Sequence, residues 1–139
     1  MPLPTKNLTH EEVHELFENR EIGNNEAFFN RVLPNVHWTV MGTHPLAGVY
    51  HSKEDFLNAT SKRLNKLLKE GKNLLKIKHI FVDGMTAIVE MKGLSTAKNG
   101  KPFDNIYCWI VTFDENKMIS SVRAYVDSAM VQKIINENE

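Results

Sequence analysis

The side chains best suited to chemistry lie in the stretch 101–127, KPFDNIYCWIVTFDENKMISSVRAYVD. Two apolar segments there flank the polar turn 114–117, which is a β-hairpin pattern. Because side chains alternate between the two faces of a strand, each segment has one face that mixes aromatic rings with groups that hydrogen-bond or ionise. These mixed faces consist of Asn105, Tyr107, Trp109, Val111 and Phe113 in the first segment and of Arg123, Tyr125 and Asp127 in the second. Rings with a few polar groups are typical of the wall of a ligand pocket.

Asp127 is the leading candidate for acid–base chemistry. If it faces an apolar pocket, desolvation raises the pKa of its carboxyl and makes it a usable acid or base. Tyr107 and Tyr125 could donate to a substrate carbonyl, and His44 could move protons near neutral pH. Each candidate also has a structural interpretation. Asp127 could cap a helical turn that begins at Ser128, the tyrosines could be wall aromatics, and His44 could be satisfied within its own loop.

A second set of residues is expected to shape the pocket. The β-branched and aromatic segment 36–42 predicts a strand, and the loop 43–50, which contains proline and glycine together with His and Tyr, predicts a pocket rim. Glu90 is a mid-strand acid that could line the pocket or face solvent. The predicted substrate-binding residues are Trp38, Tyr50, Phe56, Glu90, Asn105, Trp109 and Tyr125, and the predicted catalytic residues are Asp127, Tyr107 and His44.

The segment 10–14 is a literal match to the H-E-x-x-H zinc motif. The local sequence accounts for its acids in another way. Thr9 and Glu12 form a capping box, and Glu11 suits the first turn of a helix because the helix dipole favours acids there. We therefore expect no metal site.

Composition limits the function classes. The chain has 139 residues, 42% of them hydrophobic, and a net charge of zero with a pI near 7. This predicts a single domain over 1–139 and argues against a general affinity for nucleic acid or acidic membranes. The one cysteine, Cys108, excludes an intrachain disulfide. The first residues lack the apolar stretch of a signal peptide, so a cytoplasmic location is expected.

The remaining patterns predict an α+β fold. Helices are expected at 9–21, 26–32 and 53–71, with a short helical turn at 128–135. Strands are expected at 36–42, 74–82 and 85–96, followed by the two segments of the stretch 101–127. Strands grouped after helices and joined by short turns predict a curved, mostly antiparallel sheet with helices across its concave face and a cavity between them.

This element order, together with VHWTVMG, HPLAGVY, KEDF and the stretch 101–127, resembles the nuclear transport factor two-like superfamily, in particular its SnoaL-like and ketosteroid-isomerase-related branch. The resemblance implies a cone-shaped α+β barrel, a deep and mainly apolar pocket, and a homodimer formed through the sheet. Alignment on Pro45–Gly48 places Thr39 and Trp109 where the steroid isomerases carry two aspartates, so that mechanism is not expected. Asp127 resembles a carboxylate that epoxide hydrolase and cyclase relatives place near the end of the last strand.

Three hypotheses follow from the pocket. The first is an enzyme without cofactor, of isomerase, cyclase or hydrolase type, that performs acid–base chemistry on a small hydrophobic carbonyl compound. The second is a module that only binds a small hydrophobic molecule. The third is a protein-interaction adaptor, which predicts a shallow cavity and an exposed apolar patch.

Overall fold

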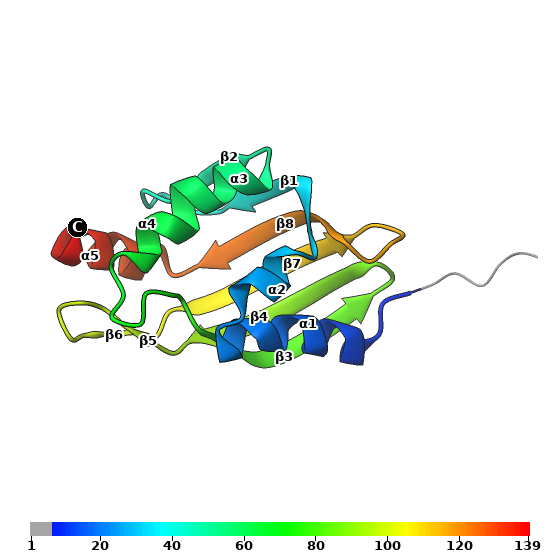
Figure 1. Cartoon of the computed structure of the whole chain (residues 1–139), viewed down its shortest axis with the longest axis horizontal. Coiled ribbons are helices and arrows are strands. Elements are labelled where there is room, and N and C mark those ends of the chain that lie inside the picture. The colour runs from blue at the N-terminus through cyan, green and yellow to red at the C-terminus, as the bar shows by residue number, and fades with distance from the viewer. Residues whose placement is uncertain (1–6) are drawn as a thin grey trace, which may run out of the picture.

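A curved six-stranded sheet carries the helices on one of its faces in the computed structural model of the chain, which describes residues 7–139 (Figure 1). The strand order is β2-β1-β8-β7-β4-β3, and all neighbours are antiparallel except β1 and β8, which are parallel. The predicted α+β class with a mostly antiparallel sheet is confirmed. The strands are β1 (Val32–Val40), β2 (Gly48–Tyr50), β3 (Leu75–Asp83), β4 (Thr86–Gly93), β7 (Ile106–Phe113) and β8 (Ile119–Val126). A separate short ladder joins β5 (Ser95–Thr96) to β6 (Pro102–Phe103).

Local signals set the ends of the first helix, α1 (His10–Ile22). The predicted capping box is present, because Thr9 and Glu12 each accept a hydrogen bond from the backbone N–H of the other. Gly23 closes the helix with a positive φ of 83°, a conformation that glycine adopts at little cost. In the zinc-like segment, His10, Glu11 and His14 are exposed, and residues 7–139 contain no cluster of three or more candidate metal ligands.

The other helices differ in length from the predictions. Helix α2 (Asn25–Phe29) ends before residue 32, because the chain is already paired with β8 there. The predicted helix 53–71 is an irregular unit that ends at Asn65. It consists of α3 (Lys53–Phe56), the π-helical turn η1 (Leu57–Ser61) and α4 (Lys62–Asn65). Helix α5 (Ser128–Asn138) is longer than the predicted turn. Every helix in the described part of the chain is too short or too polar to serve as a membrane span.

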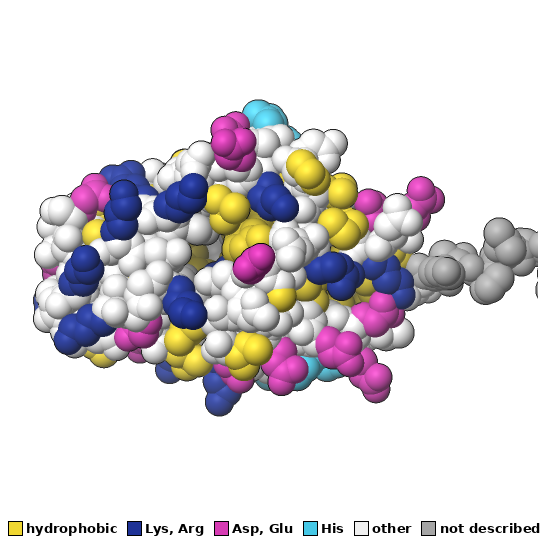
Figure 2. Space-filling view, viewed as in Figure 1, with side chains coloured by type: hydrophobic (Ala, Val, Ile, Leu, Met, Phe, Trp, Pro, Cys, Tyr) yellow, Lys and Arg dark blue, Asp and Glu magenta, His cyan; other side chains and the backbone are white. Residues whose placement is uncertain are grey.

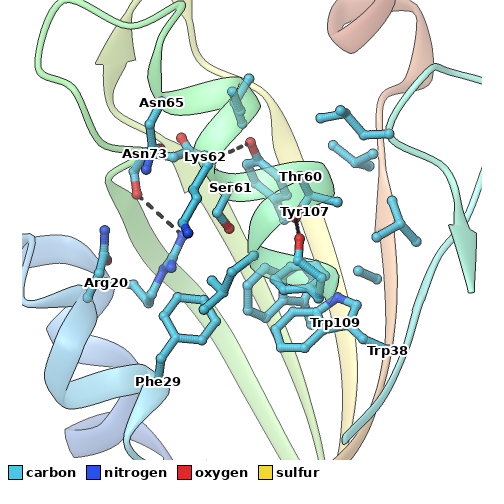
Figure 3. A pocket seen from close by; sticks show the side chains of 18 of the residues that line it. Arg20, Phe29, Trp38, Thr60, Ser61, Lys62, Asn65, Asn73, Tyr107 and Trp109 are labelled. Atoms are coloured by element: carbon cyan, nitrogen blue, oxygen red, sulfur yellow. Dashed lines mark hydrogen bonds between the residues drawn. The ribbon is translucent and has the colours of Figure 1, made fainter. Parts of the chain in front are cut away.

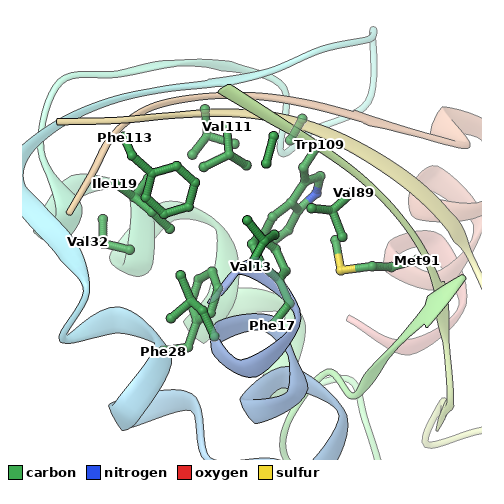
Figure 4. Packing of buried hydrophobic residues seen from close by; sticks show 14 of the residues in the cluster. Val13, Phe17, Phe28, Val32, Val89, Met91, Trp109, Val111, Phe113 and Ile119 are labelled. Atoms are coloured by element: carbon green, nitrogen blue, oxygen red, sulfur yellow. The ribbon is translucent and has the colours of Figure 1, made fainter. Parts of the chain in front are cut away.

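The main core lies between α1, α2 and the inner face of the sheet (Figure 4). Phe17 of α1 contacts Phe28 and Trp109 edge to face, with ring centroids 5.1 and 5.9 Å apart. Strands β4 and β7 contribute Val89 and Val111, both fully buried. The core thus fixes α1 against the sheet at the point where the helix also reaches the cavity described below.

The inner face of β7 is the predicted one, but the inner face of β8 is not. Tyr107 and Trp109 point inward on β7, as expected. On β8 the buried residues are Val122 and Ala124, so Tyr125 lies on the outer face, paired with Cys108. The physical reason is the pairing register. Ala124 pairs with Trp109 and Val122 with Val111, and directly paired residues lie on the same face of a sheet, so both β8 residues face inward.

Candidate functional site

A cavity of about 440 Å³ opens between the sheet and the helical layer. The face of the molecule that carries this layer is hollowed near its centre, where hydrophobic side chains are visible between charged ones (Figure 2). The wall includes the aromatic residues Phe29, Trp38, Phe56, Tyr107 and Trp109 and the aliphatic residues Val40, Leu46, Leu57, Leu64, Ala124, Val126 and Val131. This volume suits a small organic molecule.

Three of the predicted substrate-binding residues form a connected aromatic wall. Trp38 stacks on Phe56 with ring centroids 3.9 Å apart, and it meets Trp109 edge to face at 5.2 Å. Trp38 comes from β1, Phe56 from α3 and Trp109 from β7, so the wall joins the sheet to the helical layer. Both tryptophans of the chain line the cavity.

The cavity wall also carries polar side chains, including Thr60, Ser61 and Asn65 (Figure 3). Three further polar residues, Arg20, Asn73 and Tyr107, are buried and connected to one another by hydrogen bonds. Arg20 extends from α1 and donates to the backbone carbonyl of Asn73 at 3.4 Å. The side-chain amide of Asn73 donates to the hydroxyl of Tyr107 at 3.0 Å. All three side chains are buried, with 5%, 7% and 7% of their surface exposed for Arg20, Asn73 and Tyr107. We refer to these residues as the polar triad.

Burial shifts the pKa values of the two ionisable residues of the triad in opposite directions. Desolvation raises the pKa of Tyr107 to about 12, although the Asn73 hydrogen bond and the charge of Arg20 act against the rise. Desolvation lowers the pKa of Arg20 to about 10, and its electrostatic interaction with Tyr107 opposes the fall. At neutral pH the cavity therefore contains a neutral phenol and a guanidinium cation.

The rings around Arg20 hold its guanidinium in place. Its central carbon lies 5.5 Å from the ring centroids of Phe28 and Phe29 and 5.8 Å from that of Trp109. Cation–π attraction of this kind is worth about 0.5–2 kcal/mol per contact, which offsets part of the cost of burying the charge. The cation is therefore positioned by aromatic faces on the cavity side of α1.

His44 lines the cavity, as expected, but both of its ring nitrogens are engaged within its own loop. Nε2 donates to the carbonyl of Met41 at 3.1 Å, and Nδ1 accepts from the backbone N–H of Leu46 at 3.1 Å. Desolvation lowers the pKa of His44 despite the Met41 hydrogen bond. This arrangement fits the neutral ring that shapes the loop, so the prediction of a proton-moving His44 gains no support from its position.

Asp127 lies outside the cavity, contrary to the expected placement. Its exposed carboxylate caps α5, where it accepts from the backbone N–H groups of Ala129 and Met130 at 3.1 and 3.3 Å. This is the structural interpretation that the sequence had left open. Asn105 also lies outside the cavity wall. Its fully buried amide bonds the backbone of Asp127 at both N–H and C=O, which ties the end of β8 to the start of β7.

The other three expected pocket residues are also placed elsewhere. Tyr50 packs edge to face on Phe56 and donates to the carbonyl of Leu46 at 2.8 Å, so it supports the wall from behind. Glu90 pairs with Cys108 across β4 and β7, which puts it on the outer face of the sheet. Tyr125 lies on the same outer face and is 39% exposed.

Sequence reasoning missed Arg20 and Asn73. Arg20 had a detectable signal, because Val13, Leu16, Phe17 and Arg20 are spaced as one buried stripe of α1. A charged residue on an apolar stripe is unusual and indicates either a special partner or a function. Asn73 had no such signal, because it stands in a polar turn before β3.

The cavity rim carries charges of both signs. Lys53 and Lys62, from the irregular helical unit, line the opening together with Glu26 of α2. Lys53 donates to the carbonyl of Phe29 at 3.0 Å, which connects that unit to α2. Glu26 is the one carboxylate among the described residues that line the cavity, and it is exposed.

The chain is similar in sequence to two known proteins. No model of a known protein family matches the chain. It is 32% identical over 130 residues to the dimerizing cyclase phiC of a fungal species, covering 91% of this chain and 57% of that protein. It is 33% identical over 117 residues to the dimerizing cyclase tstC of Talaromyces stipitatus, covering 82% and 52%. The chain thus spans about half the length of the curated relatives it matches.

A solved structure covers nearly the whole chain. An NTF2-like protein from Burkholderia thailandensis superposes with a TM-score of 0.74 at 20% identity, covering 90% of this chain and 95% of that one. This likeness confirms the fold that the sequence resemblance implied.

Proposed function

We propose that this chain is an enzyme of isomerase or cyclase type that acts, without a cofactor, on a small hydrophobic carbonyl compound. The premise is that the chain has the fold of the nuclear transport factor two-like superfamily. The observation that carries the proposal is the buried, hydrogen-bonded polar triad beside the aromatic wall of the cavity. The curated relatives, which are named dimerizing cyclases, support the same reaction class.

The triad would act on the carbonyl oxygen of the substrate. Because Asn73 donates to the Tyr107 oxygen, the Tyr107 hydroxyl can direct its own proton into the cavity. A substrate carbonyl that accepts from Tyr107, beside the Arg20 cation, becomes more electrophilic, and an enolate formed from it has its negative charge stabilised there. In a cavity that excludes much of the water, such donors act more strongly than in solution.

The same cavity limits the kind of proton transfer. No carboxylate lies in its interior among residues 7–139, and the pKa of Tyr107 is too high for it to act as a base at neutral pH. The proposed substrate therefore has a C–H bond that is already acidic, such as one between a carbonyl and a ring, so that stabilising the enolate oxygen suffices to release the proton to water or to Glu26 at the rim.

The proposal is tested by α-proton exchange of 2-tetralone in D₂O, followed by ¹H NMR with purified protein. We expect exchange above the buffer rate, and a fall of about 100-fold to 1,000-fold in the Tyr107→Phe variant, the usual effect of removing one oxyanion donor. Tyr125→Phe is the matched control, because it removes the same hydroxyl from the outer face and is expected to leave the rate unchanged. Exchange at the buffer rate, or an unaffected Tyr107→Phe variant, would contradict the proposal.

A non-catalytic binding module is the second candidate function. It is favoured by the lack of an interior carboxylate in the described residues and by the engagement of both ring nitrogens of His44. Binding of 2-tetralone without exchange would support it. The adaptor hypothesis predicted a shallow cavity, and a cavity of about 440 Å³ does not match it.

We also propose that two copies associate through the outer face of the sheet, as the family resemblance implied. A row of paired residues crosses four strands there, from Phe81 through Ile88 and Ile110 to Arg123. Phe81, Ile88 and Tyr125 are 55%, 36% and 39% exposed, which leaves apolar surface for a second copy to cover.

A further inference from the structure

The guanidinium of Arg20 is buried without an acidic partner. It is 5% exposed, and none of the salt bridges in residues 7–139 involves it. Its lowered pKa of about 10 still leaves it charged at neutral pH. A buried cation is normally paired with an acid, because isolation in an apolar site is costly. The charge therefore remains available to an anion that enters the cavity.

Its hydrogen-bonding capacity is also largely unused. A guanidinium has five N–H donors, and the structure gives Arg20 one bond, the 3.4 Å contact from Nη2 to the carbonyl of Asn73. Its Nε has no acceptor in the described residues, and the indole Nε1 of Trp38, on the wall of the same cavity, has none either. Two buried acceptors on cavity-lining residues, Asn25 Oδ1 and Asn73 Oδ1, also lack a partner in the described residues. The two donors, one of them on the guanidinium, call for an oxygen acceptor on the ligand, and the two amide oxygens can accept from a donor elsewhere on it.

The rim adds to the positive potential. Three cationic side chains, Arg20, Lys53 and Lys62, line the cavity against one acid, Glu26. Clefts lined mainly by one sign of charge concentrate ligands of the opposite sign. An anionic ligand would thus be favoured both on entry and at the interior cation.

We propose that the ligand of this cavity is a hydrophobic carboxylate, and that Arg20 is the residue that binds its carboxylate group, while the hydroxyl of Tyr107 remains the donor to a carbonyl of the same ligand. The inference deepens the proposed function and rests on it for the location of the ligand. A monocarboxylate neutralises the single interior cation, and its planar pair of oxygens matches the fork of a guanidinium. A dianion such as phosphate would leave a charge unpaired among aromatic rings.

Isothermal titration calorimetry with two probes of the same shape tests the proposal. The probes are 2-naphthoate and its neutral analogue 2-naphthamide, titrated into the whole chain at neutral pH. We expect 2-naphthoate to bind about 10-fold to 100-fold more tightly, the usual strength of a charge-assisted hydrogen-bonded pair. This comparison uses the unaltered protein, so it does not depend on whether a variant folds.

Variants then assign the preference to a residue. Arg20→Met should abolish the preference for 2-naphthoate while 2-naphthamide still binds. Arg31→Met is the matched control, because Arg31 is exposed outside the cavity, and it should retain the full preference. Lys62→Met tests the rim and should change the preference by less than about 3-fold, as an exposed charge does.

The outcomes separate the inference from the proposed function. Equal binding of the two probes to the unaltered protein would overturn the carboxylate inference and leave the hydrophobic pocket standing. A preference that survives Arg20→Met but disappears in Lys62→Met would also overturn it, because the rim would then be the origin. Binding of neither probe would overturn the inference together with the hydrophobic pocket on which the proposed function depends.

Discussion

Replacement of Arg20 by methionine should make the ligand-free protein more stable. Burial lowers the pKa of Arg20 from its ordinary value to about 10 on folding, and each pKa unit corresponds to about 1.4 kcal/mol, so holding this charge costs about 3 kcal/mol. The methionine variant loses the hydrogen bond to Asn73 and three ring contacts, and at the low end of their ranges, about 0.5 kcal/mol each, these are worth about 2 kcal/mol together. We therefore expect its free energy of unfolding to rise by about 1 kcal/mol.

Urea denaturation at neutral pH, followed by tryptophan fluorescence, measures this change. Arg31→Met is the control, and its free energy of unfolding should fall by no more than about 1 kcal/mol, because Arg31 is exposed and its side chain donates a hydrogen bond only to the carbonyl of Lys117. A loss of more than about 1 kcal/mol in Arg20→Met would refute the reasoning. It would mean that the fold needs the guanidinium, and that Arg20 is a structural residue instead of a cation held for a ligand.

The alkaline pH dependence provides a second test, because the two perturbed groups act in opposite directions. Between pH 10 and 12.5 the unfolded chain keeps a proton that folded Arg20 releases, so this group makes stability rise with pH. Between pH 10 and 12 folded Tyr107 keeps a proton that the unfolded chain has lost, so this group makes stability fall. The two contributions nearly cancel in the unaltered protein.

Each variant should expose the contribution of the other residue. Relative to the unaltered protein, stability should fall by about 1 kcal/mol between pH 9 and pH 11 in Arg20→Met and should rise by a similar amount in Tyr107→Phe. Denaturation curves at pH 9 and pH 11, taken as differences from the unaltered protein, remove the contributions of the other lysines and tyrosines. Parallel profiles for all three proteins would contradict the assigned pKa shifts.

Three further predictions concern the rest of the fold. Asp127→Ala should lower the free energy of unfolding by about 1 kcal/mol in urea denaturation, because α5 loses its cap, whereas Asp127→Asn should keep the cap and the stability. Both variants should retain 2-tetralone exchange. A loss of exchange in either variant would restore Asp127 as a catalytic candidate. Phe81→Glu should give a monomer by light scattering at concentrations where the unaltered chain is a dimer. Ile22→Glu is the control and should not change the oligomeric state, because Ile22 is also exposed but lies away from the sheet. A dimeric Phe81→Glu variant would contradict the proposed interface. Gly42→Ala should cost about 1–3 kcal/mol in thermal or urea unfolding, because φ is 116° and a Cβ would lie 2.2 Å from Ser128 Oγ; an unchanged midpoint would show that the loop relaxes.

Features that depend on neighbouring residues could be predicted from the sequence. The capping box of Thr9 and Glu12 needs only the first turn of a helix, and the turn at Asp83-Gly84 needs only two strands that follow each other, with a positive φ of 62° at Gly84. The succession of helices and strands along the chain and the inner face of β7 followed from similar local patterns. These signals are strong because few alternative conformations satisfy them.

The inner face of β8 could not be predicted in the same way. Alternation gives two possible faces, and the choice between them depends on residues in other strands. In β8 both faces contain residues that tolerate burial, and pairing with the neighbouring strands decided the outcome. Ala124 pairs with Trp109 of β7 and Val40 of β1, so it shares their inward face and Tyr125, the next residue, is turned outward. The expected placement of Asp127 at the cavity was wrong for the same reason, because it assumed that the mixed face of β8 met the cavity.

The residues of the triad differ in how far their role could be predicted from the sequence. Arg20 and Asn73 are 53 positions apart and meet only because α1 packs along β3, which no local pattern records. Arg20 nevertheless interrupts the apolar stripe of its helix, and this departure from the burial pattern was a clue to the cavity in the sequence of α1.

The layered arrangement separates the shape of the cavity from its charge. The sheet supplies the aromatic walls through Trp38 and Trp109, whereas α1 supplies the cation through Arg20. A substitution at Arg20 therefore changes the charge that the cavity prefers without altering the register of any strand. The opposite holds for Ala124, where a larger side chain would reduce the cavity and leave the cation in place. If the carboxylate inference is right, Arg20→Met should change which ligands bind, whereas Ala124→Leu should weaken the acid and the amide probe alike.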